Sequence, residues 1–263
     1  MIFVEHIKIF YKRFYSAVTL LTVLPLPGWE LDFKNTTHYF PWVGIILSLV
    51  YLTVYTGLEG SISPLMLAFV IVILDGFLTG GLHLDGFSDW VDGIYSRKEG
   101  EDLRAVLKDS NIGAIGAAGL VFLILGKTFF LREVLVGEYS AVWIVFFPWF
   151  ARFFMYLIII LFPYPKGKSG LGEICQEKYY VYGYIFAFAS FLALLVLIYF
   201  VTPAYFIIRY FYFLTVAVII AGVMTYIFIK RLAVKLGGVN GDGYGASCEF
   251  CQLMVLFIGG IMA

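Results

Sequence analysis

The chain has 263 residues, of which 62% are hydrophobic and 14% are charged, and its formal net charge is zero. Soluble domains carry roughly 25% charged residues. A mean hydropathy of +0.92 therefore indicates a polytopic membrane protein. Because the chain has no net positive charge, it lacks the global basic field that would indicate a nucleic-acid partner.

The N-terminal segment interleaves charged and apolar side chains instead of forming a continuous apolar run. Glu5 and Lys8 stand next to apolar residues such as Ile9 and Phe10. This pattern predicts an amphipathic helix over residues 1–24 that lies at the membrane interface. Its charges are spread through the segment and no small-residue cleavage site follows, so we do not interpret it as a signal peptide.

The rest of the chain, residues 40–263, contains seven apolar segments long enough to cross a membrane. A membrane helix needs about 20 mostly apolar residues. We therefore predict an all-α fold, in which residues 1–263 form a single integral membrane domain built as a helical bundle. The predicted spans are Phe40–Leu58, Pro64–Leu82, Ile112–Val136, Ser140–Phe162, Tyr179–Val201, Ala204–Ile229 and Tyr244–Ala263.

Lysine and arginine alternate between the loops. The N-terminal segment and the loops at 83–111, 163–178 and 230–243 carry several basic residues each, whereas the loops between them carry none. Basic loops stay in the cytoplasm. The alternation predicts a multi-pass protein of the plasma membrane with these loops inside and the C-terminus outside.

The stretch GGLHLDGFSDWVDG, residues 80–93, places three carboxylates at the end of an apolar segment. Asp85, Asp89 and Asp92 follow one another at i, i+4 and i+7, which puts them on one helical face within about 60°. Three carboxylates on one face favour a hard divalent cation, and Mg²⁺ is usual where phosphates are handled. The alternative is a solvated acidic loop, with His83 as a hydrogen-bonded structural histidine.

A basic segment follows, with the sequence SRKEGEDLRAVLKDSNIGAIG. Arg97, Arg104 and Lys108 fall at i, i+7 and i+11, which predicts a basic stripe on an interfacial helix whose opposite face is Leu103, Val106 and Leu107. Such a stripe either anchors to anionic headgroups or binds phosphate. Lys108, Asp109 and Ser110 lead into the next predicted span, and a helix start beside polar groups can bind an anion.

Charged residues also occur inside the predicted spans. Asp75, Lys127 and Arg152 are costly at membrane depth, so they are either functional or paired with one another. The last polar cluster, GGVNGDGYGASCE, contains Asp242 and Glu249. We expect Asp242 to face the same cavity as the first three aspartates; the alternative is that it only caps the final helix.

The motif TGGLHLDGFSDWVDG followed by KDSNIG resembles the signature of the cobalamin synthase family, the adenosylcobinamide-GDP ribazoletransferases. Four positions depart from the family pattern: Val23 and Asn111 stand where Arg is usual, Asn240 where Thr is frequent and Gln252 where Glu is common. The likeness extends over most of the chain through LLTVLPLP (20–27), FPWVG (40–44), AR (151–152), GLG (170–172) and GGVNGDGYGA (237–246).

The resemblance implies a reaction that joins adenosylcobinamide-GDP to α-ribazole, or to its 5′-phosphate, and releases GMP. It implies Mg²⁺ as cofactor, held by Asp85, Asp89 and Asp92, and His83 or one of the aspartates as the acceptor of a ribose hydroxyl proton. We expect Asp242 to join the metal site, as a direct ligand or through a metal-bound water. The expected substrate-binding residues are Arg97, Arg104, Lys108, Asp109, Ser110, Lys127, Arg152, Asn240 and Glu249.

The expected partners are these two substrates and the lipid bilayer, with no nucleic acid, and a homo-oligomer is left open. Two other classes of membrane protein share part of this pattern. A CDP-alcohol phosphotransferase also uses spaced aspartates on membrane helices, but its Asp-Gly motif continues with Ala-Arg, whereas Asp85-Gly86 is followed by Phe87-Ser88. A transporter would place its charges near the bilayer midplane and often shows internal repeats.

Overall fold

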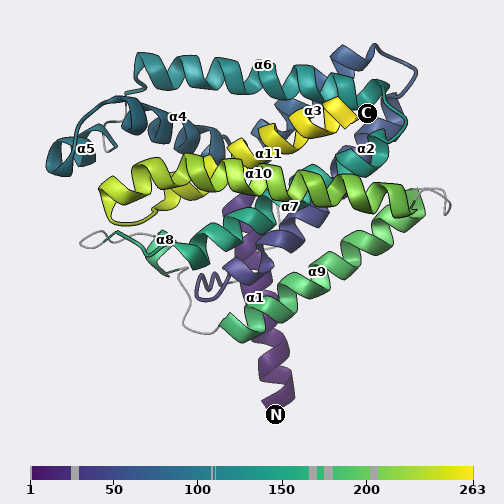
Figure 1. Cartoon of the computed structure of the whole chain (residues 1–263). Coiled ribbons are helices and arrows are strands. Elements are labelled where there is room, and N and C mark those ends of the chain that lie inside the picture. The colour runs from purple at the N-terminus through teal and green to yellow at the C-terminus, as the bar shows by residue number, and fades with distance from the viewer. Residues whose placement is uncertain are drawn as a thin grey trace.

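The structure is a computed structural model that describes residues 2–24, 30–107, 109, 111–165, 171–174, 180–201 and 207–262. The described residues form helices and connecting turns and contain no strand, which confirms the predicted all-α fold (Figure 1). The elements are α1 (Ile2–Leu21), η1 (Thr37–Tyr39), α2 (Phe40–Leu58), α3 (Pro64–Leu78), α4 (Leu82–Tyr95), α5 (Gly100–Val106), α6 (Ala114–Val136), α7 (Ser140–Leu161), α8 (Leu171–Ile174), α9 (Tyr180–Val201), α10 (Ile207–Leu236) and α11 (Gly241–Met262).

Among the described residues, six helical segments are long and apolar enough to cross a membrane. They comprise α2 together with η1, then α6, α7, α9, α10 and α11, and the bent pair of α3 and α4 brings the number to at most seven. The chain is therefore a multi-pass helical membrane protein, as its hydropathy predicts.

The predicted span Pro64–Leu82 is wrong at its C-terminal end. Helix α3 stops at Leu78, and α4 starts at Leu82 after a bend of 91°. Gly80 and Gly81 both adopt left-handed backbone angles, with φ of 60° and 72°. Only glycine enters that region without steric cost, so two in succession end one helix and redirect the chain.

Two further boundaries differ from the sequence prediction. Helix α10 continues to Leu236, so the first half of the expected loop 230–243 is helical. Helix α11 starts at Gly241, which puts Asp242 in its first turn. Both shifts occur because polar residues continue a helix beyond the apolar run that hydropathy detects.

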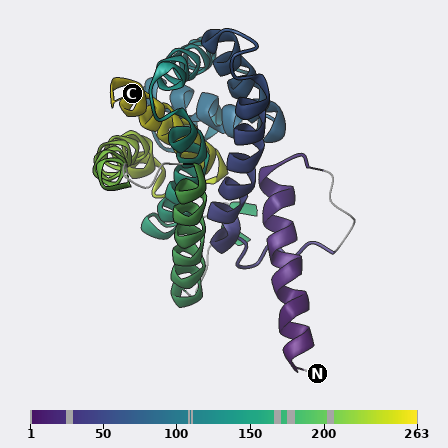
Figure 2. The ribbon, with the colours of Figure 1, turned by 90° about the vertical axis from the view of Figure 1, so that its right-hand side faces the viewer.

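Helix α7 forms the centre of the bundle. In its most apolar window 78% of the residues are buried, against 22% for α9 and for α10, which lie at the periphery. Gly44 allows α2 to pack directly on α7, since a Cβ at this position would lie 2.6 Å from the Cα of Trp149. The N-terminal half of α1 extends beyond the bundle (Figures 1 and 2). Its placement at the membrane interface stays a prediction.

Candidate active site between α4 and α11

Helices α4 and α11 touch through their backbones at two glycines. A Cβ at Gly86 of α4 would lie 2.9 Å from the Cα of Asp242, and a Cβ at Gly245 of α11 would lie 3.1 Å from the Cα of His83. The approach at Gly86 is closer than a real Cβ atom makes to a neighbouring backbone, and the one at Gly245 is tighter than most real Cβ contacts. The two glycines therefore bring the start of α11 against the acidic helix.

Asn240 shapes the first turn of α11. Its side-chain nitrogen donates to the Asp242 carboxylate at 2.6 Å. Its side-chain oxygen accepts the backbone N–H of Gly243 at 3.4 Å, as an N-cap residue does. Asn240 thus performs the capping that was the alternative explanation for Asp242.

Asp85 and Asp242 line one pocket with a volume of about 170 Å³. His83 lines the same pocket, and its two ring nitrogens are buried without a hydrogen-bond partner among the described residues. The structure thus brings Asp242 to one pocket with Asp85, although the two motifs are far apart in the sequence; Asp89 and Asp92 are not among the described residues that line it.

Asp89 lies one turn further along α4, outside the six spanning segments. Partial burial, together with the negative charges of Asp242, Asp85 and Asp92, raises its pKa to about 6. Neither Asp85 nor Asp89 forms an ion pair with another described residue. The four carboxylates therefore create a shared region of negative potential.

Asp92 has a different environment from the other three aspartates. One carboxylate oxygen accepts the backbone N–H of Gly113 at 2.9 Å, and the other accepts that of Gly116 at 2.8 Å. These N–H groups begin α6 and have no partner within their own helix. A Cβ on either glycine would collide with the Asp92 carboxylate. Asp92 thus joins α4 to α6, a contact that the helical-face analysis missed because its partner is backbone.

The donor set fits a magnesium ion that a phosphate substrate helps to bind. No three His, Cys, Asp or Glu side chains in the described part of the chain are arranged to hold a metal alone. Mg²⁺ commonly takes one or two protein carboxylates and completes its octahedron with waters and substrate phosphates. Asp85, Asp89 and Asp242 can supply such carboxylates, and Asp92 keeps lone pairs beyond its two hydrogen bonds.

The intramembrane charges form a separate cluster in the bundle core. The Asp75 carboxylate accepts hydrogen bonds from Lys127 at 2.8 Å, Tyr51 at 2.6 Å and Arg152 at 3.2 Å, and Lys127 also pairs with Glu249 at 2.9 Å. All five side chains are at most 2% exposed. Two cations thus balance two carboxylates, which is the ion-pair alternative stated for these residues. Lys127, Arg152 and Glu249 are not among the described residues that line the 170 Å³ pocket, and their roles toward substrate stay predictions.

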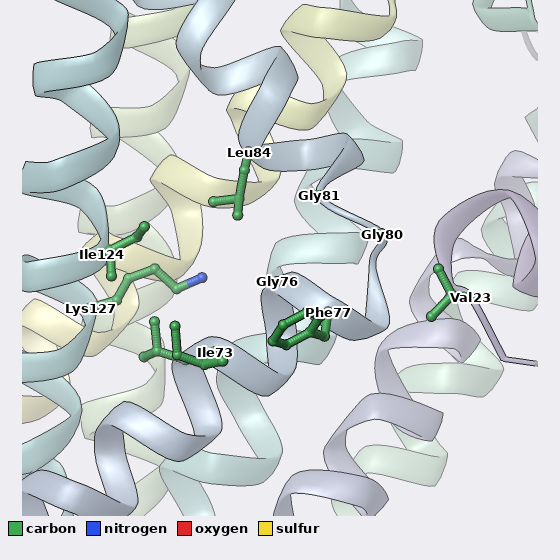
Figure 3. Close-up of a pocket in the computed structure, with 10 residues that line it drawn as sticks. Val23, Ile73, Gly76, Phe77, Gly80, Gly81, Leu84, Ile124 and Lys127 are labelled. Atoms are coloured by element: carbon green, nitrogen blue, oxygen red, sulfur yellow. The ribbon is translucent and has the colours of Figure 1, made fainter.

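A larger apolar pocket of about 640 Å³ is lined by residues on both arms of the α3–α4 bend, together with residues of α6. Figure 3 shows Ile73, Gly76 and Phe77 of α3 on one side of it, with Lys127 reaching in from α6. The Lys127 amine also holds Asp75 and Glu249, so it stands between this pocket and the buried cluster.

The expected basic stripe is not a single helical face. Helix α5 spans only Gly100–Val106, and Arg97 precedes it as an exposed residue with a left-handed φ of 56°. The apolar face is confirmed in part, since Leu103 and Leu107 are buried. Asp109 accepts two hydrogen bonds from Asn111, at 3.0 and 2.9 Å, which lower its pKa. The Arg104 side chain and residues 108 and 110 lie outside the described part of the chain.

Fold and site together define a multi-pass membrane protein with a pocket lined by carboxylates. Comparison with known proteins identifies the family. The profile described as cobalamin-5-phosphate synthase matches residues 13–260. The chain belongs to this family, and it is a transferase of cobalamin biosynthesis.

Curated relatives agree with this assignment. The adenosylcobinamide-GDP ribazoletransferase of Chlorobium phaeobacteroides is 33% identical over 257 residues, covering 94% of this chain and 97% of the relative. The protein of the same name from Desulfitobacterium hafniense is 32% identical, with coverage of 93% and 95%. No solved structure matches the chain. The family assignment leaves the CDP-alcohol phosphotransferase and transporter alternatives without support.

Proposed function

We propose that the enzyme joins adenosylcobinamide-GDP to α-ribazole, or to α-ribazole 5′-phosphate, at the pocket between α4 and α11. The names of the relatives supply the reaction. The observation that carries the assignment to this site is that Asp85 and Asp242 line a single pocket. Asp89 lies beside them, and its pKa is raised first by burial and then by the charges of the neighbouring carboxylates.

In this reaction a ribose hydroxyl of α-ribazole attacks the phosphorus attached to cobinamide. The new bond is between the ribose oxygen and that phosphorus, the bond to GMP breaks, and GMP leaves. Phosphoryl transfer depends mostly on positioning and on charge neutralisation. A bound Mg²⁺ would supply that neutralisation at the pyrophosphate.

The protein's own groups hold and orient the reactants. Asp85, Asp89 and Asp242, with Asp92, would provide the carboxylates for the metal, and the hydrogen bond from Asn240 orients the Asp242 carboxylate. The hydroxyl proton passes to His83 or to one of the aspartates. His83 lines the pocket and its ring nitrogens lack described partners, but burial lowers its pKa to about 3, which makes it a weak proton acceptor and favours one of the aspartates.

We also propose that the site faces the cytoplasm of a cell whose plasma membrane holds the protein. Arg97 and Lys98 follow directly after α4, and Lys230, Arg231 and Lys235 lie in the last turns of α10, just before α11. Both elements of the site are therefore next to basic segments, which the positive-inside rule places in the cytoplasm. Soluble nucleotide substrates are available on that side.

The proposal is tested with purified protein in detergent or nanodiscs, by following both products by liquid chromatography and mass spectrometry. We expect GMP and a cobalamin product in equal amounts, and only when both substrates are present. GMP release without α-ribazole would indicate hydrolysis, and no release at all would contradict the proposed reaction.

A further inference from the structure

The 170 Å³ pocket has a polar side and an apolar side. Asp85, Asp242 and His83 form the polar side. Apolar side chains from three other elements also line the pocket. These are Leu21 of α1, Phe40 of α2, and Met155 and Ile159 of α7, all at most 5% exposed.

The volume of the pocket limits what it can hold. Pockets that enclose a whole drug-sized ligand measure ~300–1,000 Å³, whereas this one measures about 170 Å³. It therefore accommodates one part of a substrate, of the size of a fused pair of aromatic rings. A corrin macrocycle is far too large to enter it.

The residues that line the pocket favour one of the two bases in the substrates over the other. A guanine ring carries donors and acceptors on several edges, so even with one edge paired to the polar residues, the groups turned toward Met155 and Ile159 would stay unpaired, which is costly. A benzimidazole ring is apolar except for one ring nitrogen that is not bonded to the ribose. His83 is 2% exposed and offers an unpartnered ring nitrogen within the same wall.

From this match we infer that the pocket is the binding site for the apolar bicyclic base of the attacking nucleoside, with Met155 and Ile159 determining which base is accepted. The base packs between α1, α2 and α7, and its ribose points toward Asp85 and Asp242, where the hydroxyl must be activated. The inference rests on the proposed function and assigns the attacking nucleoside, rather than GMP or the corrin, to this cavity.

The test compares α-ribosides of 5,6-dimethylbenzimidazole, unsubstituted benzimidazole and adenine as nucleophiles, by kcat/KM for GMP release. A buried methyl group contributes about fourfold in binding, so the two methyl groups together should give the wild type roughly a fifteenfold preference over benzimidazole. The polar adenine riboside should react more slowly still.

Ile159→Ala should reduce that preference to about threefold or less, because the methyl groups lose their packing partner. Ile158→Ala is the matched control: Ile158 is equally buried on the same helix, is not among the residues that line the pocket, and should leave the preference unchanged. If Ile159→Ala does not fold, Met155→Leu and Ile159→Val are milder changes to the same wall and should shift the preference about twofold.

The outcomes separate the inference from the proposed function. If the Ile159 and Met155 variants release GMP and keep the wild-type preference among the ribosides, as the Ile158 variant should, the base pocket is overturned and the reaction is left intact. The cavity would then hold an acyl chain or another part of the substrate. Absence of GMP release with every riboside would overturn the proposed reaction and the inference with it.

Discussion

Gly86 of α4 packs against the backbone of Asp242 at the start of α11, where a Cβ on residue 86 would lie 2.9 Å from the Asp242 Cα. This contact sets the spacing between the two acidic segments. The side chains of Asp85 and Asp242 share a pocket because nothing larger than hydrogen separates the two helices at this point.

Gly86→Ala should therefore reduce activity strongly, by at least tenfold, because the methyl group forces α4 and α11 apart. The matched control is Gly57→Ala in α2, where a Cβ would meet nothing within 4 Å. That change should leave activity intact and raise stability slightly, since Ala is favoured over Gly in a helix by about 1 kcal/mol. Equal activity of the two variants would show that the close contact is not required.

Asp92 should differ from Asp85 when each is substituted. Asp92→Ala leaves the N–H groups of Gly113 and Gly116 without their acceptor and should lower stability by about 1–3 kcal/mol. Asp85 has no ion pair among the described residues, so Asp85→Asn should lower turnover with little change in melting temperature. Thermal unfolding in detergent measures the difference, and equal melting temperatures for the two variants would contradict the assigned role of Asp92.

Asp75 should be essential for folding, because it holds Lys127 and Arg152 in the core. Removing one partner of a buried ion pair typically costs about 3–5 kcal/mol, so Asp75→Asn should express poorly or melt far below the wild type. The exposed pair of Arg132 and Glu133 is the control, and Glu133→Gln should change stability by less than ~1 kcal/mol. Similar losses of stability in the two variants would mean that burial does not determine how much an ion pair contributes.

Sidedness can be tested with single-cysteine labelling in intact cells. A cysteine introduced at Glu99, in the basic segment after α4, should react with a membrane-impermeant maleimide only after the cells are opened. One added at the C-terminus should react in intact cells. Labelling of residue 99 from outside would reverse the proposed orientation of the active site.

The sequence was sufficient for the parts of the fold that depend on hydropathy. The runs of apolar residues located α2, α6, α7, α9 and α11 to within a few residues. Hydropathy does not report the direction in which a helix axis runs, however. The 91° bend at Gly80 and Gly81 was therefore included in the predicted span as its C-terminal end. That bend turns the aspartate helix away from the axis of α3.

Some side-chain contacts could be predicted from the sequence and others could not. Charged residues inside spans correctly suggested a pairing of Asp75 with Lys127 and Arg152, because isolated charges are costly in lipid. The bond between Asp92 and the start of α6 could not be predicted, since its acceptor meets backbone N–H groups that any sequence carries. The signal was Gly113-x-x-Gly116, whose missing side chains make room for the carboxylate.

The central claim is that Asp85 and Asp242 belong to one metal-dependent site, and the most direct measurement is GMP release by Asp242→Asn over a titration of Mg²⁺. We predict normal expression and melting, no release in EDTA for the wild type, and turnover reduced about 10²–10³-fold in the variant, as for the loss of one group that stabilises transition-state charge. Full turnover of the wild type in EDTA, or of Asp242→Asn at the same Mg²⁺ concentration as the wild type, would contradict the account.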